Sequence, residues 1–454
     1  MWTGRFPPVM ATHVSNWGNF PVVEADLRSP GGAGQMARLL ADAPQAVVRG
    51  MGRSYGDASL GPYILSSLKL NKILALDADE GTVTCQAGVT LADLLEVFVP
   101  RGWFLPVSPG TKFITVGGAI AADVHGKNHH AEGSFCRHLL RMRLLLADGG
   151  EVECSRQTAP DLFETTCGGM GLTGAILDAT FSLKKINTAY IREEILEARD
   201  LDHIMQLFEA STGWTYSVAW IDCLAQGKNL GRSLLMRGEH AEIPELDSKN
   251  KREAPLRLPA KRKRGVPCHL PSWILNRYSV RAFNGLYYRL NARGTRRHIV
   301  DYDTFFYPLD FLHDWNRIYG RQGFVQYQFV LPLESSREGL QTVLERIGEK
   351  GWGSFLAVLK LFGPQEGLMS FPMEGYTLAL DFPVREGLLP FLDELDELVV
   401  ERGGRIYLAK DARMKQETLW RGYPNTVAFV NRIERWNPDF RFRSRQSSRL
   451  GVTP

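Results

Sequence analysis

Two glycine-rich segments carry residues whose types and spacing suit the binding of a flat ligand that bears phosphate. The first runs from Arg49 to Asp57 (RGMGRSYGD), between the strand-like runs AVV and YILSSL. Its glycines at positions 50, 52 and 56 permit positive φ values, and successive backbone amides in such a turn form an anion-binding nest. Taken alone, the segment fits an ordinary glycine hairpin equally well.

The second segment, Val107 to His130, favours the ligand-binding interpretation. Small residues from Gly117 to Ala122 let a bulky, flat ligand lie against the backbone, and His125, Lys127 and Asn128 supply hydrogen-bond donors beside it. Together the two segments predict a surface on which a cofactor with a pyrophosphate group lies.

A metal site is not expected in the second segment. His125 and His129 have the i, i+4 spacing of zinc ligands on a helix, but Gly126 argues against a helix through them. No carboxylate follows as it does in zinc proteases. We therefore expect loop histidines that form ordinary hydrogen bonds, and no metal.

A third glycine segment, Gly169 to Gly174 (GMGLTG), matches the G-x-G-x-x-G pattern of dinucleotide-binding βαβ folds, but its context is reversed. In those folds the glycines follow a strand and open a helix, so that the pyrophosphate meets the helix N-terminus. Here Asp161 to Cys167 has a helical pattern before the glycines, and Gly174 to Leu183 has a strand pattern after them. NAD binding through such a fold is therefore not expected.

The size and composition of the chain predict a globular protein of two or three domains. Of its 454 residues, 44% are apolar and 23% charged, which allows a sizeable core and argues against long disorder. A net charge of +4 is too small to make nucleic acid the expected partner. The cysteines stand singly, without a C-x-x-C pair, and predict reduced thiols: Cys85, Cys136, Cys154, Cys167, Cys223 and Cys268.

The sequence carries no recognisable export or membrane-spanning signal. Its first residues, MWTGRFPPVMATHVSNWG, lack a basic start followed by an apolar stretch, which argues against a secretory signal. No segment approaches the roughly 18 consecutive apolar residues of a spanning helix. We expect a cytoplasmic protein without a transmembrane helix, any membrane contact being peripheral, at the inner face of the plasma membrane.

The elements that must position these residues fall into two regions. Residues 46–185 combine short strand-like runs and glycine loops with two helices, over Leu91 to Val99 with Thr90 as N-cap and over Asp161 to Cys167. From about Ala189, alternating aromatic runs predict an antiparallel sheet, and helical stretches run from Gly339 to Lys350 and from Leu388 to Arg402. After Arg405 the pattern returns to strand (RIYLA) and helix. The prediction is an α+β fold with a first domain over 1–188, completed by 405–454, and a second over 189–404.

A basic, proline-punctuated run from Lys249 to Gly265 interrupts the second region. It is followed by PSWILNRYSVRAFNGLYYRL, which mixes arginines with large apolar residues. We expect a solvated, mobile basic loop at about 245–300. Contact of this surface with anionic lipid headgroups is the alternative that the sequence leaves open.

Six motifs carry a resemblance to a known family: RGMGRSYGD, SPGTKFITVGGAIAADVHGKNHH, FETTCGGMGLTGAI, QYQFVLP, LAVLKLFG and RIYLAKDAR. Together they resemble the vanillyl-alcohol-oxidase superfamily of FAD-dependent enzymes, and within it the family of decaprenylphosphoryl-β-D-ribose 2'-oxidases. The likeness spans roughly Pro44 to Pro424. It implies a two-lobed, PCMH-type FAD-binding domain and a substrate domain built on an antiparallel sheet with flanking helices.

The resemblance also implies which residues hold FAD. They are Arg49, Gly50, Met51, Gly52, Arg53, Ser54, Tyr55, Gly56, Asp57, Gly110, Thr115, Val116, Gly117, Gly118, Ala122, Asp123, Val124, His125, Gly126, Lys127, Asn128, Ile176 and Tyr407. Many sugar oxidases of the superfamily carry a histidine in the first loop that bonds covalently to the flavin. Because Arg53 stands at that position here, we expect non-covalent FAD.

One departure from the family pattern lies in the segment GYTLALDFP. In the mycobacterial enzymes the matching segment carries a cysteine near the flavin, whereas Ala379 stands at about that place in this chain. Inhibitors that trap that cysteine are therefore expected to fail here.

Oxidation of a secondary alcohol needs a hydride acceptor, flavin N5, and a group that takes the hydroxyl proton. Lys410 is the first candidate. A lysine that ends a strand is more often solvated, and the resemblance is what makes it a catalytic candidate; burial beside a cofactor would lower its pKa toward that of a useful base. Tyr55 and His125 are the alternative proton acceptors, and packing or positioning explains either of them as well.

The residues expected to line the substrate site are Lys127, Trp220, Tyr307, Gln326, Gln328 and Lys360. Period-two geometry sends Gln326 and Gln328 to one face of a strand, where either a sugar pocket or a polar outer face accounts for them. Lys127 or Lys360 would pair with a phosphate. Core packing explains the two aromatic residues as well as a pocket wall does.

The expected function is therefore FAD-dependent oxidation of the 2'-hydroxyl of a (poly)prenylphosphoryl-ribose to a keto sugar. In cell-wall biosynthesis this is the first half of an epimerisation to arabinose, which a keto-reductase partner completes. Two alternatives stay open: a soluble sugar, polyol or sugar-lactone oxidase on the same fold, and a non-catalytic binding protein.

Overall fold

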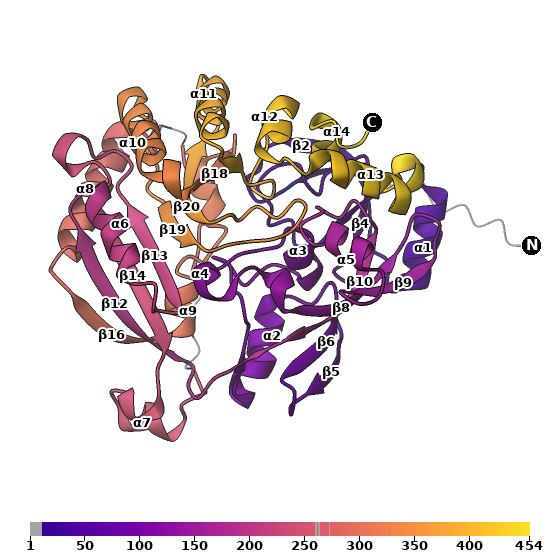
Figure 1. Cartoon of the computed structure of the whole chain (residues 1–454), viewed down its shortest axis with the longest axis horizontal. Helices are drawn as coiled ribbons and strands as arrows, with labels where there is room; N and C mark the ends of the chain where they lie inside the picture. The colour runs from indigo at the N-terminus through magenta and orange to yellow at the C-terminus, as the bar shows by residue number, and fades with distance from the viewer. Residues whose placement is uncertain (1–10, 259–260, 262–263, 272) are drawn as a thin grey trace, which may run out of the picture.

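The computed structural model contains three larger β-sheets, of four, five and eight strands, with their helices (Figure 1). Two further sheets are two-stranded and pair β7 (Trp103–Phe104) with β11 (Lys184–Lys185) and β15 (Arg264–Gly265) with β17 (Leu312–His313). The structure describes residues 11–258, 261, 264–271 and 273–454. The expectation for the first ten residues and for part of the basic run therefore lies outside the described residues. In Figure 1 the eight-stranded sheet forms one side of the molecule and the four- and five-stranded sheets form the other.

The four-stranded sheet frames the first glycine segment. Its strand order is β1-β2-β4-β3, and its elements are β1 (Thr12–Ser15), β2 (Val22–Arg28), β3 (Val47–Arg49), β4 (Tyr63–Ser66) and helix α1 (Ala33–Asp42). Strands β3 and β4 pair in parallel, with Val47 opposite Ile64. The glycine segment lies between these two strands, as the sequence predicts.

The five-stranded sheet is antiparallel, in the order β5-β6-β10-β8-β9. Its strands are β5 (Ile73–Asp77), β6 (Thr82–Gln86), β8 (Leu139–Leu145), β9 (Glu151–Ser155) and β10 (Ala175–Ser182). Helix α5 (Pro160–Thr166) precedes the GMGLTG segment and β10 follows it, so the helix–glycine–strand order is confirmed. The other elements of this region are α2 (Leu91–Phe98), β7 (Trp103–Phe104), α4 (His129–Glu132) and β11 (Lys184–Lys185).

A short helix replaces part of what the sequence suggests is an irregular loop. Helix α3 (Val116–Ala121) begins at Thr115, whose side chain accepts a hydrogen bond from the Gly118 amide at 3.2 Å. Its small side chains allow the helix to approach the five-stranded sheet, because a Cβ on Gly117 would lie only 3.0 Å from that of Ala87. The low helix propensity of paired glycines hid this element in the sequence.

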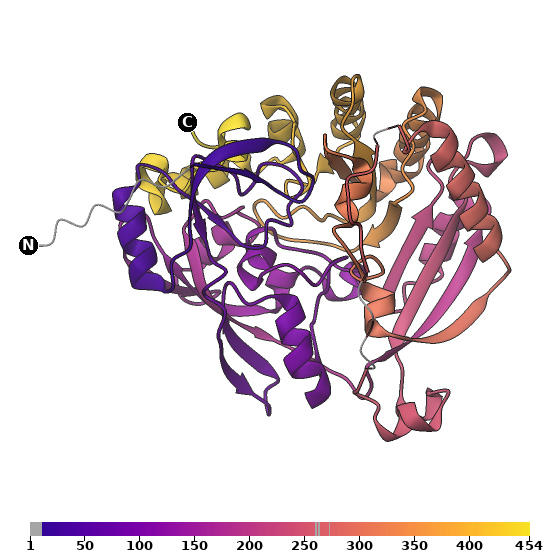
Figure 2. The same ribbon diagram turned by 180° about the vertical axis from the view of Figure 1, so that it is seen from behind.

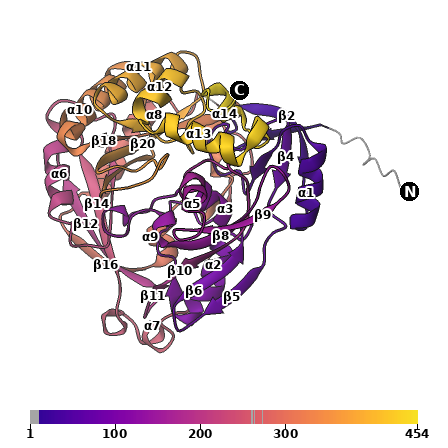
Figure 3. The same cartoon turned by 45° about the vertical axis from the view of Figure 1, so that its right-hand side comes forward.

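The eight-stranded sheet has the order β16-β12-β14-β13-β19-β20-β18-β21. Its strands are β12 (Tyr190–Ala198), β13 (Tyr216–Ile221), β14 (Ser233–His240), β16 (Arg296–Asp301), β18 (Phe324–Pro332), β19 (Ala357–Phe362), β20 (Gly375–Pro383) and β21 (Arg405–Ile406). One face packs in a large apolar core with α6 (Leu201–Glu209), α10 (Leu333–Lys350) and α11 (Leu388–Glu401). The opposite face carries polar side chains near the centre of the sheet and turns toward α3 (Figure 3).

The region near 245–300, for which a basic loop is expected, contains regular structure. Its described part includes α7 (Lys249–Glu253), β15 (Arg264–Gly265) and the 15-residue α8 (Arg277–Asn291), and it leads into β16, α9 (Tyr302–Phe306) and β17 (Leu312–His313). Asn276 caps α8 by accepting hydrogen bonds from the Tyr278 and Ser279 amides. The basic composition of the region obscured this helix in the sequence. Its buried residues Val280 and Asn284 pack on the sheet domain, and this tertiary packing is not visible in the sequence.

The C-terminal segment contacts both smaller sheets and the large one. Helices α12 (Gln416–Gly422), α13 (Thr426–Trp436) and α14 (Arg445–Arg449) lie along the top in Figure 1. Strand β21 pairs with β18, whereas the Arg443 amide bonds the Ala46 carbonyl at 2.9 Å and Phe442 packs beside Leu65. The domain boundaries stay a prediction, with which these contacts agree.

Two properties of the described residues bear on the chemistry. Their cysteines are all free thiols, five of them buried. No helix in the described part of the chain is both long and apolar enough to cross a bilayer.

Candidate active site

The first glycine loop is held in close contact with neighbouring backbone. A Cβ on Gly50 would lie 2.3 Å from Thr115 Oγ1, and one on Gly56 would lie 1.9 Å from the Asp411 carbonyl oxygen. Gly52 has a φ of +64°, in the left-handed region that favours glycine. The loop therefore packs against the start of α3 on one side and against the C-terminal segment on the other.

The two glycine segments expose a continuous strip of backbone. Residues 49–54 and 117–118 are at least partly exposed, although residues 55–58, 115–116 and 119–120 beside them are buried. Because Gly50 meets Thr115, the two exposed strips adjoin. At least partly exposed glycines at positions 50, 52, 117 and 118 allow the close approach of a cofactor pyrophosphate and ring.

Several polar side chains of these segments are engaged with the protein itself. Arg49 donates to the Ser15 carbonyl and to Asn16, Asp57 pairs with Arg449, Asp123 accepts from Cys136 N and Ser370 Oγ, and Asn128 donates to the Pro106 carbonyl. These side chains shape the loops and leave the exposed backbone to meet a cofactor.

Arg53 lies at the rim of the first loop, over an aromatic ring. Its guanidinium carbon is 3.8 Å from the centroid of the Trp17 ring and 5.6 Å from that of Phe113. Burial lowers the pKa of this guanidinium, and the charge of Asp310 opposes that shift. An arginine held in a cation–π contact offers no nucleophile for a flavin methyl group.

His125 is a buried, neutral imidazole with one free ring nitrogen. The Gln328 amide nitrogen donates to His125 Nε2 at 3.1 Å, which assigns the ring proton to Nδ1. In the described part of the chain His125 Nδ1 has no hydrogen-bond partner. Burial, followed by the charges of Lys360, His129 and Lys410, lowers its pKa well below the usual range. A buried donor without a partner fits a polar group of a bound cofactor or substrate.

Tyr55 connects the first glycine loop to the large sheet. Its hydroxyl accepts a hydrogen bond from Gln326 Nε2 at 3.3 Å, and the same amide donates to Asp381 Oδ1 at 2.5 Å. The Tyr319 hydroxyl donates to Asp381 Oδ2 at 3.3 Å. Burial, together with the Asp381 charge, raises the pKa of Tyr55 well above its usual value, so this phenol stays protonated.

Lys410 reaches this cluster from a turn rather than from a strand. Strand β21 ends at Ile406, and the Lys410 amide bonds the Tyr407 carbonyl at 3.0 Å. Its Nζ lies 4.1 Å from the centroid of the Tyr55 ring. Burial lowers the pKa of Lys410 to about 7, although the charge of Asp381 raises it. The sequence predicts that Lys410 ends a strand, and this prediction is wrong. The strand comprises only Arg405 and Ile406, which pair with β18, and Lys410 lies in the turn that follows.

Asp381 is the acidic partner of Lys410, and burial raises its pKa to about 7. It lies opposite Gln326 in the β18–β20 ladder. Sequence reasoning missed Asp381, and also Tyr319, which bonds it. The available signal is a charged residue in an otherwise apolar strand, two positions after Ala379 and therefore on the same face.

Two further lysines extend the positive charge along the polar face of the sheet. Burial lowers the pKa of Lys360 to about 8, and that of Lys127 to about 7, against the opposing charge of Glu193. The charge of Lys360 also lowers the pKa of both Lys127 and Lys410. Lys127 Nζ donates to the Phe305 carbonyl. A phosphate bound beside Lys360 and Lys127 would favour their protonated forms, which would then pair with it.

The polar face of the large sheet is partly exposed near its centre. Ala379 is the one residue of the nine in β20 that is not fully buried, and its cross-strand neighbours are Gln328 and Val358. Val358 and Lys360, on the same face of β19, are also partly exposed. These partly exposed side chains lie on the sheet face where Gln328 bonds His125 and Gln326 bonds Tyr55.

Three of the remaining predicted substrate residues lie on the polar face of the large sheet, and the fourth lies away from it. Gln326 and Gln328 share one face, as predicted, through their contacts with Tyr55 and His125. Trp220 shares that face, opposite Val358. Tyr307 is buried against Ser108 behind the second glycine segment.

Three predicted cofactor contacts occupy different environments. Tyr407 donates to the Ala122 carbonyl at 3.1 Å and stacks on Phe371. Ile176 is buried in the core beneath the five-stranded sheet. Gly110 is exposed, and a Cβ there would meet nothing within 4 Å.

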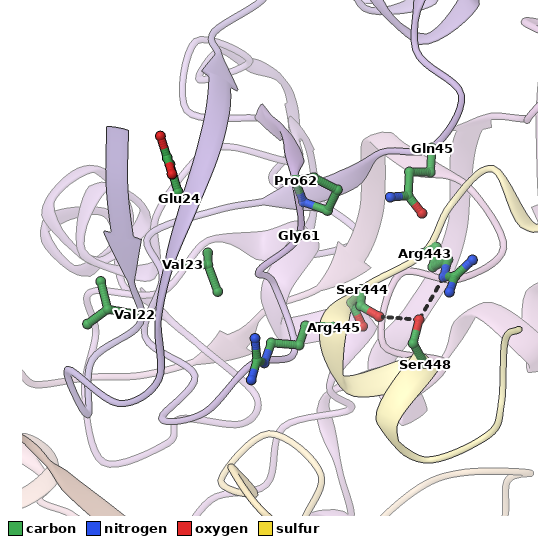
Figure 4. Close-up of a pocket in the computed structure, with 10 residues that line it drawn as sticks. All are labelled: Val22, Val23, Glu24, Gln45, Gly61, Pro62, Arg443, Ser444, Arg445 and Ser448. Carbon is green, nitrogen blue, oxygen red and sulfur yellow. Dashed lines mark hydrogen bonds between the residues drawn. The ribbon is translucent and has the colours of Figure 1, made fainter. Parts of the chain in front are cut away.

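A separate pocket of about 510 Å³ lies between β2 and α14 (Figure 4). Its polar residues largely bond one another: Ser448 Oγ accepts from Arg443 at 2.7 Å and donates to the Ser444 carbonyl. Its lining residues do not include Tyr55, Gln326, Asp381 or Lys410. In the described residues, no group of three or more His, Cys, Asp and Glu side chains is placed to hold a metal ion.

Comparisons with known proteins agree with this site. Residues 29–155, which include both glycine segments, match the model of an FAD binding domain. The chain is 38% identical to a decaprenylphosphoryl-beta-D-ribose oxidase of Mycolicibacterium smegmatis, over 99% of this chain and 96% of the relative. The chain belongs to the decaprenylphosphoryl-β-D-ribose oxidase family.

Two other relatives match a smaller part of this chain. An uncharacterized protein from Streptomyces coelicolor, encoded in the mprA 5' region, is 36% identical over 80% of this chain and all of its own length. The L-gulonolactone oxidase of Mus musculus is 30% identical over 33% of this chain and 35% of its own.

This member of the decaprenylphosphoryl-β-D-ribose oxidase family is an FAD-dependent oxidoreductase that acts on a CH–OH donor. The expected α+β fold with a PCMH-type FAD-binding domain is confirmed. The accessible glycine strip and the free Nδ1 of His125 fit FAD as the cofactor.

Proposed function

We propose that this oxidoreductase oxidises the 2'-hydroxyl of a (poly)prenylphosphoryl-ribose to the keto sugar. The observation that carries the proposal is the cluster of Gln326, Asp381 and Lys410 on the sheet face that also bears Lys360. Lys127 lies beside this sheet, where its carbonyl accepts from the Ser217 amide. The 38% identical mycobacterial relative is a decaprenylphosphoryl-beta-D-ribose oxidase, which supports the same substrate class.

Residues of both glycine segments would hold FAD, without a covalent bond because Arg53 takes the place of a histidine. FAD, when bound, supplies the hydride acceptor, flavin N5. Exposed backbone from Gly50 to Ser54 and at Gly117 and Gly118 would meet the pyrophosphate and the ring. His125 would donate from Nδ1 to a polar group at the site.

The proton of the 2'-hydroxyl would pass to the Nζ of Lys410. A lysine with a pKa of about 7 is largely neutral slightly above neutral pH and therefore has a lone pair for that proton. Tyr55 and His125 are weaker candidates, because the raised pKa of Tyr55 keeps it protonated and the lowered pKa of His125 makes it a poor base. As the C2' hydride leaves the carbon, loss of the hydroxyl proton leaves a ketone.

Lys360 and Lys127 would hold the phosphate, and Gln326 and Gln328 would hydrogen-bond the ribose. Trp220, on the same face as Val358 and Lys360, would provide an apolar wall. The order of these side chains orients the sugar between the phosphate-binding lysines and Lys410.

The proposal includes an epimerisation to arabinose in which a separate keto-reductase consumes the product. A prenyl chain on the substrate also requires peripheral access to a membrane. The epimerisation and the membrane access both rest on the proposed substrate and on the similarity to the mycobacterial decaprenylphosphoryl-beta-D-ribose oxidase.

The test is anaerobic bleaching of the bound flavin. The purified protein should be yellow, and acid should release its FAD into solution, which excludes a non-catalytic binding protein and a covalent flavin. Farnesylphosphoryl-ribose should bleach the flavin absorption, whereas xylitol and L-gulonolactone should not. Bleaching by the free polyol or the lactone alone would replace the proposal with that of a soluble sugar or lactone oxidase.

A further inference from the structure

Helix α8 presents a row of large apolar side chains to solvent. Phe283 is 47% exposed, Leu286 59% and Leu290 50%, and their i, i+3, i+7 spacing places them on one stripe. Trp273, just before the helix, is 73% exposed. Single exposed apolar residues are ordinary, but a stripe along one helix marks an interaction surface. Figure 2 shows α8 at the outer rim of the molecule, beside the large sheet.

The stripe lies in a segment of unmixed positive charge. Residues 254–300 contain eleven lysines and arginines and neither aspartate nor glutamate. Arg281, Arg289 and Arg293 are exposed, and within the described residues none of the three forms an ion pair. An amphipathic helix with arginines beside an exposed apolar stripe suits the headgroup region of an anionic bilayer.

Aromatic contacts connect this stripe with the polar face of the sheet. The Phe283 ring stacks on Tyr287 with centroids 5.9 Å apart and an interplanar angle of 13°. Tyr287 in turn meets Trp220 at 4.7 Å. Trp220 lies opposite Val358, which is two residues before Lys360 on the same face. The line from Phe283 therefore leads from the surface to the phosphate-binding lysines of the proposed site.

We propose that the exposed stripe of α8, Phe283, Leu286 and Leu290, docks on an anionic phospholipid bilayer. The prenyl chain of the substrate would then pass from the bilayer along Phe283, Tyr287 and Trp220 to the sugar site. The second statement rests on the proposed function, whereas the first does not. The occupant is a bilayer because exposed arginines flank the stripe and residues 254–300 contain no acidic residue, which suits anionic headgroups beside an apolar layer.

Vesicle co-sedimentation of the full-length, FAD-loaded protein tests the docking. Vesicles of phosphatidylcholine with about 30% phosphatidylglycerol should pellet the wild type, and pure phosphatidylcholine or added salt should weaken binding. The double variant Leu286→Glu/Leu290→Glu should bind at least about tenfold more weakly. The matched control is Leu74→Glu/Leu140→Glu, since these leucines are 49% and 45% exposed on the five-stranded sheet. It should bind like the wild type.

Three outcomes would overturn the docking surface. These are a wild type that does not sediment with anionic vesicles, a Leu286→Glu/Leu290→Glu variant that binds them as well as the wild type does, and a wild type that binds neutral vesicles as well as anionic ones. The assay contains no sugar, so its result is independent of the proposed reaction. Failure of the proposed function would instead appear as a flavin that soluble farnesylphosphoryl-ribose does not bleach in wild type and variant alike. Retained FAD absorption in the α8 variant controls for misfolding.

Discussion

At the scale of single residues, Lys410 and Asp381 form a buried acid–base pair whose pKa values approach each other. Burial disfavours charge on both groups, lowering one pKa and raising the other, and their mutual attraction opposes both shifts. Gln326 and Tyr319 hold the carboxylate, so the lysine is the member that is free to exchange a proton with a substrate.

Lys410→Ala is expected to keep bound FAD and to lower kcat by about 10²- to 10⁴-fold, the usual contribution of a general base. Stopped-flow flavin reduction by farnesylphosphoryl-ribose measures this loss, and the visible spectrum controls for cofactor content. Normal turnover of Lys410→Ala would show that another group takes the proton.

The same pair gives the rate of flavin reduction a predictable pH dependence. The rate should rise with pH through about 7, as Lys410 loses its proton and becomes a base. The Asp381 anion stabilises the lysine cation and so raises its pKa; Asp381→Asn should therefore move this limb of the profile to lower pH. A purely structural role of Asp381 would lower the rate at all pH values and leave the limb in place.

The sequence identified Lys410 only through a family motif, because spacing alone describes a solvated lysine at a strand end. Gln326 and Gln328 were predicted to share a face from strand alternation, which is a local property. Asp381 escaped notice because its significance depends on Gln326 and Lys410, which are distant in sequence and meet only in the folded chain.

The first glycine loop packs so closely against the turn that carries Lys410 that there is no room for a side chain at Gly56. Gly56 faces the Asp411 carbonyl, one residue after Lys410, and Tyr55 N bonds the Ala409 carbonyl at 3.1 Å. The loop and the turn that carries Lys410 are therefore fixed to each other. A displacement of one moves the other relative to the sheet.

Gly56→Ala should consequently weaken FAD retention and lower stability by about 1–3 kcal/mol or more, as overpacked sites do. Gly34→Ala is the matched control: it lies within α1, and a Cβ there meets nothing within 4 Å. That substitution should stabilise the protein by about 0.5–1 kcal/mol through helix propensity. Thermal unfolding and flavin fluorescence release report both effects. Wild-type behaviour of Gly56→Ala would contradict the rigid loop–turn contact.

Elements with strong local signals were predictable from the sequence, and those stabilised by tertiary contacts were not. Thr90 begins α2 as predicted, since its side chain and that of Asp93 form a reciprocal capping box. By contrast, α3 is rich in glycine, and α8 follows a basic, proline-containing run that hides its start. Each helix has an N-cap, but each also depends on packing against a sheet. Strand β21 was predicted to be longer because the strand-like run RIYLA continues past Ile406. The chain turns there instead, since the Lys410 and Asp411 amides bond the Tyr407 carbonyl.

At the scale of the whole molecule, the C-terminal segment fastens the cofactor loop to the Lys410 turn. Arg449 pairs with Asp57 at 2.8 Å and with Asp411 at 2.7 Å, and both carboxylates are almost fully buried. The charge of Arg449 lowers the pKa of Asp411 against its desolvation, so this carboxylate stays ionised in the fold. One cation from the last helix therefore compensates two anions that flank the proposed active site.

Arg449→Met should destabilise the protein by about 3–5 kcal/mol, because it removes the guanidinium that pairs with both buried carboxylates, at 2.8 Å and 2.7 Å. Arg445→Met is the matched control on the same helix: that side chain is 56% exposed and 3.8 Å from Asp57, so its loss should cost less than about 1 kcal/mol. The thermal unfolding midpoint should fall clearly for the first variant only. FAD should dissociate more readily from it as well, because Asp57 belongs to the glycine loop. Equal midpoints for the two variants would mean that the C-terminal segment packs on the cofactor domain through its apolar contacts alone.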